Sequence, residues 1–246
     1  MTASMTSLRP ASREALRKVS TATLTTVLFK RGFRNVFIQG IFLLNKDAPR
    51  MVGEAFTLRY IPAREDLDQL GAFEGRGHPQ REAIEACPPG HVLMMDARRD
   101  ASAATGGDIL MTRLMVRGAA GVVTDGGLRD SPTIEQLPWP VYCAARSAPL
   151  NLVHHHAVDS QVPIGCGGVA VYPGDIVVGD AEGVVVIPGN IADEVAGEAA
   201  SQTVFEDWVE ARVKEGRSIF GLYPPSPETR AEFEAWKKNR GQAPNS

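Results

Sequence analysis

Arg129 and Asp130 form a charged pair that follows a double glycine in the middle of the chain. Earlier in the chain, another double glycine ends at Gly107 and leads into Asp108 and Ile109, where an apolar run begins. If that run is helical, its first N–H groups carry partial positive charge and can bind an anion. An arginine pairs with carboxylates, and a carboxylate can hold a hydrated Mg²⁺. Together these groups suit a small dicarboxylate or oxoacid and a divalent cation.

The elements around these residues are predicted to bring them to one place. Apolar residues recur at helical spacing from Ile109 to Ala120, which predicts a helix that begins just after Gly107. The apolar run Val122–Thr124 predicts a short strand, and the glycines after it predict a turn. If the strand packs against the helix, the loop that follows carries Arg129 and Asp130 to the edge of the sheet where the helix begins.

The rest of the chain alternates helix-like and strand-like segments, which favours a layered α/β domain. Residues 63–79 are polar and predict a long surface loop, and residues 162–187 predict a β-rich block in which Val184–Ile187 is a covered, central strand. Helices are predicted from a Ser12 cap, from Ser20 to Gly32, over Gln80–Ala86 and Ser131–Leu137, from Asn190 to about Lys214 and over Ser226–Lys238; further strands are predicted over Val36–Leu44, Phe56–Ile61, His91–Asp96 and Val141–Ala145.

The composition is that of an ordinary globular protein. The chain has 246 residues, of which 43% are hydrophobic and 22% charged, enough for a large core in one domain. A net charge of −3 offers no electrostatic footprint for direct nucleic-acid binding. No apolar stretch reaches the ~18 residues of a membrane span and no signal core is evident, so we expect a cytoplasmic protein with no membrane partner. Cys87, Cys143 and Cys166 lack a C-x-x-C spacing and are typical of reduced structural thiols.

The run GGDIL, followed by RGAAGVVTDGGLRD and then VPIGCGGVAVYPGDIVVGDAEGVVVIP, resembles the RraA-like family. This family includes the regulator of ribonuclease E activity and the metal-dependent 4-hydroxy-4-methyl-2-oxoglutarate/4-carboxy-4-hydroxy-2-oxoadipate aldolases. The resemblance covers roughly residues 20 to 205, and its most specific part is the Arg-Asp pair after the double glycine. It implies a layered β/β/α fold of the swivelling-domain type. Members of the family form trimers or hexamers whose active sites lie at subunit interfaces.

The resemblance also implies roles for individual residues. Arg129 matches the family's substrate-binding arginine, Asp130 matches the metal-ligating aspartate, and Asp108 matches the aspartate that positions a catalytic water. Backbone amides from Gly107 through Asp108 and Ile109 to Leu110 would hold the pyruvyl carboxylate. Family members also bring an acidic residue from the C-terminal helix of a neighbouring subunit towards the metal, and Glu206 or Asp207 could take that place.

Cleavage of a 4-hydroxy-2-oxoacid leaves a pyruvate enolate, which enzymes stabilise with a lysine Schiff base or with a bound metal. Most lysines of this chain fall on polar helix faces or chain ends, and none has a strand-end context that suggests a desolvated amine, which disfavours the imine route. The metal route needs few protein ligands if Mg²⁺, or Mn²⁺, keeps several waters and takes two oxygens from the substrate. Asp130 would supply the carboxylate, and Arg129 would favour the negative charge that grows on the substrate.

Two other groups of residues invite a functional interpretation. His154, His155 and His156 are consecutive, so their side chains point in different directions and rarely share one metal ion. Gly165–Gly168 lacks the Lys-Ser/Thr of a phosphate-binding loop, which favours close backbone packing, and Cys166 within it has no predictable activating base.

The two ends of the chain are predicted to lie outside the compact part of the single RraA-like domain. Residues 1–11 show no periodicity and are predicted to form a flexible arm. Residues 190–246 are predicted to form a helical extension of the domain. This extension carries many aromatic side chains, and burial at a subunit interface would explain them. The aromatic residues in question are Trp208, Phe220, Tyr223 and Trp236.

We therefore expect a divalent-metal-dependent aldolase that cleaves 4-hydroxy-2-oxoacids, with oxaloacetate decarboxylase activity through the same enolate. Its partner would be a small 2-oxoacid, in a homotrimer or hexamer. One alternative is a non-catalytic protein that regulates a ribonuclease by binding it. The other is a related lyase or hydratase that acts on sugar-derived 2-oxoacids.

Overall fold

The strand β2 (Met51–Pro62) runs through the middle of the main sheet in the computed structural model, which describes residues 8–241. On one edge β2 pairs in parallel with β3 (His91–Asp96). On its other edge it pairs antiparallel with β11 (Ile176–Gly179) along its first half and with β8 (His155–Ser160) along its second half. Side chains of β2 are buried almost without interruption because both faces of the strand are covered.

The main sheet has the order β1-β6-β4-β3-β2-β11-β12, with β8 added to β2. Strands β2, β3, β4 and β6 are parallel neighbours, and the connections from β3 to β4 and from β4 to β6 pass through the helices α4 and α5. The carboxyl ends of these strands therefore meet at one edge of the sheet. The remaining bounds are β1 (Phe42–Leu43), β4 (Gly121–Thr124), β6 (Val141–Cys143), β12 (Val184–Ile187), α4 (Asp108–Val116) and α5 (Ser131–Ile134).

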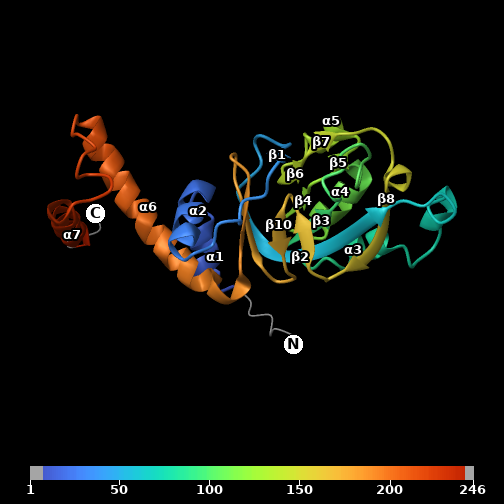
Figure 1. Cartoon of the computed structure of the whole chain (residues 1–246), viewed down its shortest axis with the longest axis horizontal. Helices are drawn as coiled ribbons and strands as arrows, with labels where there is room; N and C mark the ends of the chain where they lie inside the picture. The colour runs from blue at the N-terminus through green and yellow to red at the C-terminus, as the bar shows by residue number, and fades with distance from the viewer. Residues whose placement is uncertain (1–7, 242–246) are drawn as a thin grey trace.

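Each face of the sheet has its own hydrophobic core. Phe56 and Leu58 of β2 pack with Met111 and Leu114 of α4 on the face that α3, α4 and α5 cover. On the opposite face, the hairpin of β9 and β10 covers a second core that includes Met94. These helices and the short strands beside them lie together at one end of the molecule (Figure 1). The bounds are α3 (Pro79–Ala86), β5 (Gly127–Leu128), β7 (Ala145–Arg146), β9 (Ile164–Cys166) and β10 (Val169–Val171).

A third core joins the other end of the sheet to the helices α1 (Pro10–Leu16), α2 (Thr21–Lys30) and the first half of α6 (Ala192–Lys214). Figure 1 shows α1 and α2 lying beside α6. The start of α2 is fixed by Asp180, whose carboxylate accepts hydrogen bonds of 2.8 Å from the backbone N–H and the hydroxyl of Thr21. This contact ties α2 to the turn between β11 and β12.

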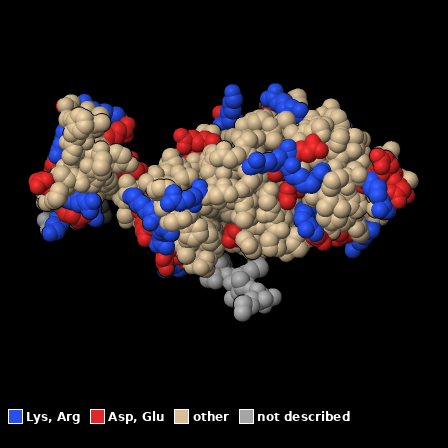
Figure 2. All heavy atoms as spheres, viewed as in Figure 1, with Lys and Arg blue, Asp and Glu red and all other residues tan. Residues whose placement is uncertain are grey.

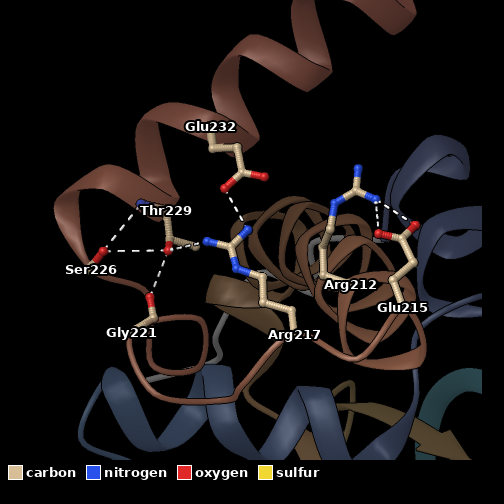
Figure 3. A network of polar contacts seen from close by, with 7 residues as sticks. All are labelled: Arg212, Glu215, Arg217, Gly221, Ser226, Thr229 and Glu232. Carbon is tan, nitrogen blue, oxygen red and sulfur yellow. Dashed lines mark hydrogen bonds and ion pairs between the residues drawn. The ribbon is translucent and has the colours of Figure 1, made fainter.

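Beyond this core, α6 continues as an arm that ends in α7 (Pro227–Gly241), at a distance from the sheet (Figure 1). Trp208 and Phe233 form a small core between the two helices. The link between them is held by polar contacts (Figure 3): Arg217 donates to Glu232 at 2.6 Å, and the hydroxyl of Thr229 donates to the carbonyl of Gly221 at 2.7 Å. The buried Trp208 therefore packs within its own chain, contrary to the expectation that a neighbouring subunit buries it, whereas Phe220 is 91% exposed.

The predicted layered α/β architecture is confirmed: this is a mixed α/β fold with a curled mixed sheet and terminal helices. The helices over 20–32, 80–86 and 190–214 and the strands over 56–61 and 91–96 are present, each within a few residues of its predicted bounds. The predicted surface loop at 63–79 carries only the short helical turn η1 (Leu70–Phe73). The remaining short turns are η2 (Asn151–Val153) and η3 (Gly189–Ile191).

Several local predictions are wrong. Ser12 lies inside α1 rather than at its N-cap, and Asn190 lies in η3 and does not cap α6. The predicted strand over 36–44 is reduced to β1, because residues 36–38 instead pair with β12. As a result β12 is not central: it is the last strand of the sheet, and its free edge is covered by that segment.

The predicted flexible arm is also too long. Leu8 is buried, and α1 already begins at Pro10. The part of that arm at residues 1–7, like the end of the predicted extension at residues 242–246, lies outside the described residues. Within residues 8–241, no helix is both long and apolar enough to cross a membrane. Figure 2 shows acidic and basic side chains interspersed over the visible face.

Candidate active site

Arg129 and Asp130 lie directly against Gly107, the N-cap residue of α4. A Cβ atom at Gly107 would be 2.7 Å from Oδ2 of Asp130 and 3.0 Å from Cγ of Arg129. The two charged side chains therefore occupy the space that a side chain at residue 107 would need. The sequence prediction that the glycine loop, the arginine and the aspartate converge agrees with this geometry.

These residues line a cleft of about 350 Å³. That volume is at the lower end of the range for small-molecule sites, so the cleft suits a small acid rather than a large coenzyme. Arg129 and Asp130 are about half exposed at its rim, where Nε of Arg129 donates to Oδ2 of Asp130 at 3.1 Å. The lining residues come from the glycine loop, the start of α4, the loop after β5, the turns η1 and η2, and α3; they are Leu70, Phe73, Gln80, Arg81, Ala104, Gly106–Leu110, Arg129, Asp130, Leu150 and Asn151.

The first turn of α4 is arranged differently from the predicted open cradle of amides. Asp108 accepts a hydrogen bond of 2.8 Å from the N–H of Ile109 with its own carboxylate. The N–H of Leu110 donates to the carbonyl of Gly107 at 3.1 Å. Two of the amides proposed for anion binding are therefore already engaged. Asp108 is in a position where its negative charge also complements the N-terminus of the helix.

The loop that carries Arg129 and Asp130 is fixed by close backbone packing. A Cβ at Gly126 would be 2.6 Å from Cβ of Ala97, and one at Gly127 would be 2.5 Å from Cβ of Ser147. The N–H of Arg129 then donates to the carbonyl of Gly106 at 3.1 Å, which joins the two halves of the site directly. The double glycine thus lets the chain after β4 approach the loop before α4.

Asp130 itself has a left-handed backbone, with φ of 53° and ψ of 30°. Asp and Asn adopt this conformation more readily than most other residues. It turns the chain sharply between β5 and α5, so that the carboxylate of Asp130 points to Gly107 while Ser131 begins the next helix.

Asp125 is a structural residue that the sequence reasoning did not single out. Its buried carboxylate accepts hydrogen bonds from the N–H groups of Ala97 at 2.6 Å, Gly167 at 3.0 Å and Arg99 at 3.1 Å. Burial raises the pKa of Asp125 above its ordinary value, although these N–H donors oppose that rise. The residue ties the end of β4 to the loop after β3 and to the β9–β10 turn.

His154, His155 and His156 face three different partners. His154 lies 3.7 Å from Asp100, and Nδ1 of His156 lies 2.8 Å from Asp68. His155 is buried between Ala103 and Arg98: its Nε2 donates to the carbonyl of Ala103 at 3.2 Å, and its Nδ1 accepts from Arg98 at 3.1 Å. No group of three or more potential metal-ligating side chains is found among residues 8–241.

The His155 contacts predict a dependence of stability on pH. Burial lowers the pKa of His155 below its ordinary value of 6.5, and the positive charge of Arg98 acts in the same direction. Because the unfolded chain takes up a proton at a higher pH than the folded one, the stabilisation is present above pH 6.5 and is lost as the pH falls towards the folded-state pKa. We expect the free energy of unfolding of the wild type to fall between about pH 7 and pH 5, and His155→Gln to show a shallower fall.

Urea denaturation at several pH values measures this slope. His78 also has a lowered pKa because of burial, so it contributes the same slope to both proteins and cancels in the comparison. The variant His91→Gln, at a half-buried position away from the site, serves as the control. Parallel profiles for wild type and His155→Gln would contradict the assignment.

The predicted close packing of the glycine-rich turn at 165–168 holds at Gly167 and Gly168 but not at Gly165, where a Cβ would meet nothing within 4 Å. A Cβ at Gly167 would overlap Ile38, and one at Gly168 would overlap the guanidinium of Arg99. Cys166 is fully buried, and burial raises the pKa of its thiol well above the ordinary value. Burial also raises the pKa of Cys87 and Cys143 to about 12, so the three free thiols stay protonated.

Glu206 and Asp207 belong to the second half of α6. This part of α6 and the helix α4 lie at opposite ends of the molecule (Figure 1). Glu206 accepts hydrogen bonds from the hydroxyl of Thr23 at 2.8 Å and from Gln202 at 2.9 Å. Its contacts within the chain therefore connect α6 to α2. A role for either residue in the site of a neighbouring subunit stays a prediction.

The chain matches the model of the RraA-like family, described as Aldolase/RraA, over residues 21–186. The chain belongs to the RraA-like family. The match runs from α2 to β12 and includes the whole candidate site. It ends before α6, so the arm lies outside the matched segment.

Among the relatives of this RraA-like protein, one is named as an aldolase and another as a member of a ribonuclease inhibitor family. A protein of Halalkalibacterium halodurans, named "Putative 4-hydroxy-4-methyl-2-oxoglutarate aldolase", is 33% identical over 143 residues, which are 58% of this chain and 67% of that relative. The crystal structure of RraAS2 from Streptomyces coelicolor, described as an unusual member of the RNase ES inhibitor RraA protein family, is 29% identical, with a TM-score of 0.73 over 82% of this chain and 96% of that one.

The structure of an uncharacterised protein from Pseudomonas syringae pv. tomato matches a larger share of this RraA-like chain. Its crystal structure has a TM-score of 0.79 and covers 91% of this chain and 97% of that chain, at 24% identity. At this identity the likeness supports the fold alone.

Proposed function

We propose that the protein is a divalent-metal-dependent aldolase that cleaves 4-hydroxy-2-oxoacids to pyruvate, and that it also decarboxylates oxaloacetate. The observation that carries the proposal is the contact of Arg129 and Asp130 with Gly107 at the rim of a small cleft, beside Asp108. The distant relative named as an aldolase supports the same reaction class.

The donor set of the cleft fits Mg²⁺ or Mn²⁺ better than zinc. Asp130 presents a half-exposed carboxylate, and no cluster of three or more His, Cys, Asp or Glu side chains exists in the part of the chain that the structure describes. Mg²⁺ is commonly held by one or two carboxylates together with waters and substrate oxygens, whereas zinc requires three or four protein ligands. When bound, the cation would act as a Lewis acid that withdraws electrons from the 2-oxo group of the substrate.

The residues around the cation site would perform the remaining tasks. Arg129 would pair with the oxygens of the 2-oxoacid and stabilise the negative charge that develops there when the C3–C4 bond breaks. Asp108, through a water molecule, would take up the proton of the 4-hydroxyl group and return a proton to C3, which yields pyruvate and a carbonyl product. With oxaloacetate the same bond breaks and CO₂ leaves, so one arrangement serves both reactions.

The cleft also argues against the imine mechanism. None of its described lining residues is a lysine, and a Schiff-base aldolase needs a lysine within reach of the 2-oxo group. The cationic side chains that line the cleft are those of Arg81 and Arg129. Neither can form an imine, because the guanidinium group of an arginine stays protonated in proteins.

We further propose that the protein acts as a homotrimer or hexamer in the cytoplasm, without binding nucleic acid directly. The arm formed by α6 and α7 projects from the body of the molecule (Figure 1). It bears exposed apolar side chains, with Phe220 91% and Ile219 55% exposed. Such side chains suit burial against another copy of the chain.

The test is release of pyruvate from 4-hydroxy-4-methyl-2-oxoglutarate and from oxaloacetate by the purified protein. We expect turnover with Mg²⁺ or Mn²⁺, its loss on removal of divalent ions with a chelator, and its return when the metal is restored. Absence of turnover of both substrates at saturating metal would refute the proposal.

A second candidate function is binding and inhibition of a ribonuclease, which the likeness to the Streptomyces coelicolor protein favours. A regulator that acts through its surface does not need the Arg129–Asp130 pair. A protein in which both residues are replaced should then bind the ribonuclease as the wild type does while the aldolase activity is lost, which separates the two functions.

A further inference from the structure

Thr105 is a buried polar residue directly before the double glycine that meets Arg129 and Asp130. It is fully buried and is not one of the described lining residues of the cleft. Its backbone N–H donates to the carbonyl of Gly127 at 2.8 Å. Its hydroxyl lies 3.1 Å from the same carbonyl oxygen and 3.1 Å from the hydroxyl of Thr124. One residue thereby connects the loop before α4 to β4 and β5, the strands that lead to the charged pair.

The carbonyl group of Thr105 is held from the other side. It accepts hydrogen bonds from Nε2 of Gln80 at 2.6 Å and from the hydroxyl of Tyr60 at 3.2 Å. Gln80 and Tyr60 are both buried, and hydrogen bonds in the protein interior are stronger than hydrogen bonds in water. The N–H, carbonyl and hydroxyl groups of Thr105 therefore all have partners, and these partners come from α3, β2, β4 and β5.

The methyl group of Thr105 packs against the second double glycine of the site. A Cβ at Gly126 would be 2.8 Å from Cγ2 of Thr105, so the methyl group lies directly against this glycine. The N–H of Gly126 in turn donates to the hydroxyl of Thr124 at 3.1 Å. The pairing of the two loops continues where the N–H of Arg129 donates to the carbonyl of Gly106 at 3.1 Å. A shift at Thr105 would therefore be transmitted to Arg129.

We propose that the hydroxyl of Thr105 positions the two loops of the candidate active site against each other. Thr105 is a positioning residue, because it acts through Arg129 and Asp130. This inference rests on the proposed function, since an effect on turnover is expected only if the two loops form one active site. The transition state needs both loops in register, whereas the oxoacid can still bind through Arg129 alone. Loss of the hydroxyl should therefore lower kcat more than it raises KM.

Two substitutions at residue 105 separate the hydroxyl from the methyl group. Thr105→Val keeps the methyl group and removes the hydroxyl, whereas Thr105→Ser does the reverse. For metal-dependent pyruvate release from oxaloacetate, we expect kcat of Thr105→Val to be about tenfold below that of the wild type, with KM within about twofold. Thr105→Ser should restore kcat to within about twofold of the wild type. Both variants disturb a buried residue, so a role in stability alone would not produce this difference.

Thr57→Val is the matched control. Thr57 is also fully buried, and its hydroxyl donates to the carbonyl of Val162 at 2.6 Å, outside the cleft. This variant should lower the unfolding temperature as Thr105→Val does and should keep the wild-type kcat. If Thr105→Val does not fold, Gln80→Met carries the same test, because it removes one donor to the carbonyl of Thr105 and leaves Tyr60 as the other. It should also lower kcat more than it raises KM.

Hydrogen exchange at the backbone N–H of Arg129 tests the positioning without metal or substrate. This N–H should exchange about tenfold faster in Thr105→Val than in the wild type, and at nearly the wild-type rate in Thr105→Ser and Thr57→Val. An unchanged rate in Thr105→Val overturns the inference.

The kinetic results separate this inference from the proposed function. If the wild type releases pyruvate but Thr105→Val keeps its kcat, or Thr105→Ser or Thr57→Val loses as much, only the inference fails. If the wild type releases no pyruvate, the proposed function fails, and the exchange rate at Arg129 alone decides whether Thr105 positions the two loops.

Discussion

Asp130→Asn should lower the rate of metal-dependent pyruvate release by about 1,000-fold or more, with little effect on the fold. The substitution removes the negative charge that would hold the divalent cation and changes almost nothing else. Asn tolerates the left-handed backbone at this position, where φ is 53°. The lost contact is a half-exposed ion pair of 3.1 Å with Arg129, and such pairs contribute only about 0–1 kcal/mol to stability.

Steady-state kinetics with oxaloacetate, together with thermal unfolding, measures both parts of this prediction. Asp66→Asn is the control, because Asp66 forms a comparable exposed ion pair with Arg64 at 2.7 Å, on the loop before α3. Arg129→Met should reduce the rate by a similar factor, since it removes the charge that stabilises the reacting oxoacid. Activity of Asp130→Asn within tenfold of the wild type would contradict the assignment of Asp130 as the metal ligand.

Gly107→Ala should reduce the same activity by about 100-fold, although residue 107 has no side chain of its own to contribute. The added methyl group would be 2.7 Å from Oδ2 of Asp130 and 3.0 Å from Cγ of Arg129. Oδ2 is the far end of the Asp130 side chain at the rim of the cleft and can turn away at small cost, whereas Cγ of Arg129 has to shift by a few tenths of an ångström. The protein should therefore fold, but with its charged pair displaced from the start of α4.

Gly71→Ala is the matched control, since Gly71 lies in η1 beside the cleft and a Cβ there would meet no atom within 4 Å. It should keep wild-type activity. Circular dichroism should show wild-type secondary structure for both variants. Wild-type activity of Gly107→Ala would mean that the close approach of Arg129 and Asp130 to this glycine is not needed for catalysis.

The centre of the candidate site could be predicted from the sequence because its signals are local. A helix that begins after Gly107, a short strand after it and a double glycine before Arg129 are each readable from a few neighbouring residues. The parallel arrangement of β3 and β4 then places the two loops at the same edge of the sheet. Residue types and short-range spacing are enough to specify this part.

The far side of the cleft could not be predicted in this way. Arg81 and Asn151 lie on α3 and η2, on either side of the central stretch in the sequence, and only the tertiary fold brings them to one cleft. Nothing in the sequence around Asn151 indicates that its Nδ2 atom is buried without a hydrogen-bond partner among residues 8–241. Similarly, the backbone contacts of Asp125 join three separate loops. Asp125 follows β4, its partners Ala97 and Arg99 follow β3, and its partner Gly167 follows β9.

The errors at the edges of the fold have a related cause. The apolar segment at 36–44 has the composition of a strand, but only Phe42–Leu43 enters the sheet beside β6, while residues 36–38 cover the edge of β12. The apolar run of β12 is buried on both faces, as its composition predicts. Burial on both faces, however, does not distinguish a central strand from a last strand that another segment covers.

A crystal structure of the protein with Mg²⁺ and oxalate would test the central claim most directly, because oxalate resembles the charge distribution of the reacting pyruvyl group. We predict one cation bound to the carboxylate of Asp130 and to two oxalate oxygens, with the guanidinium of Arg129 on the oxalate and the ligand above Gly107. Oxalate and cation bound elsewhere, with the Arg129–Asp130 pair unchanged and without ligand, would contradict the account.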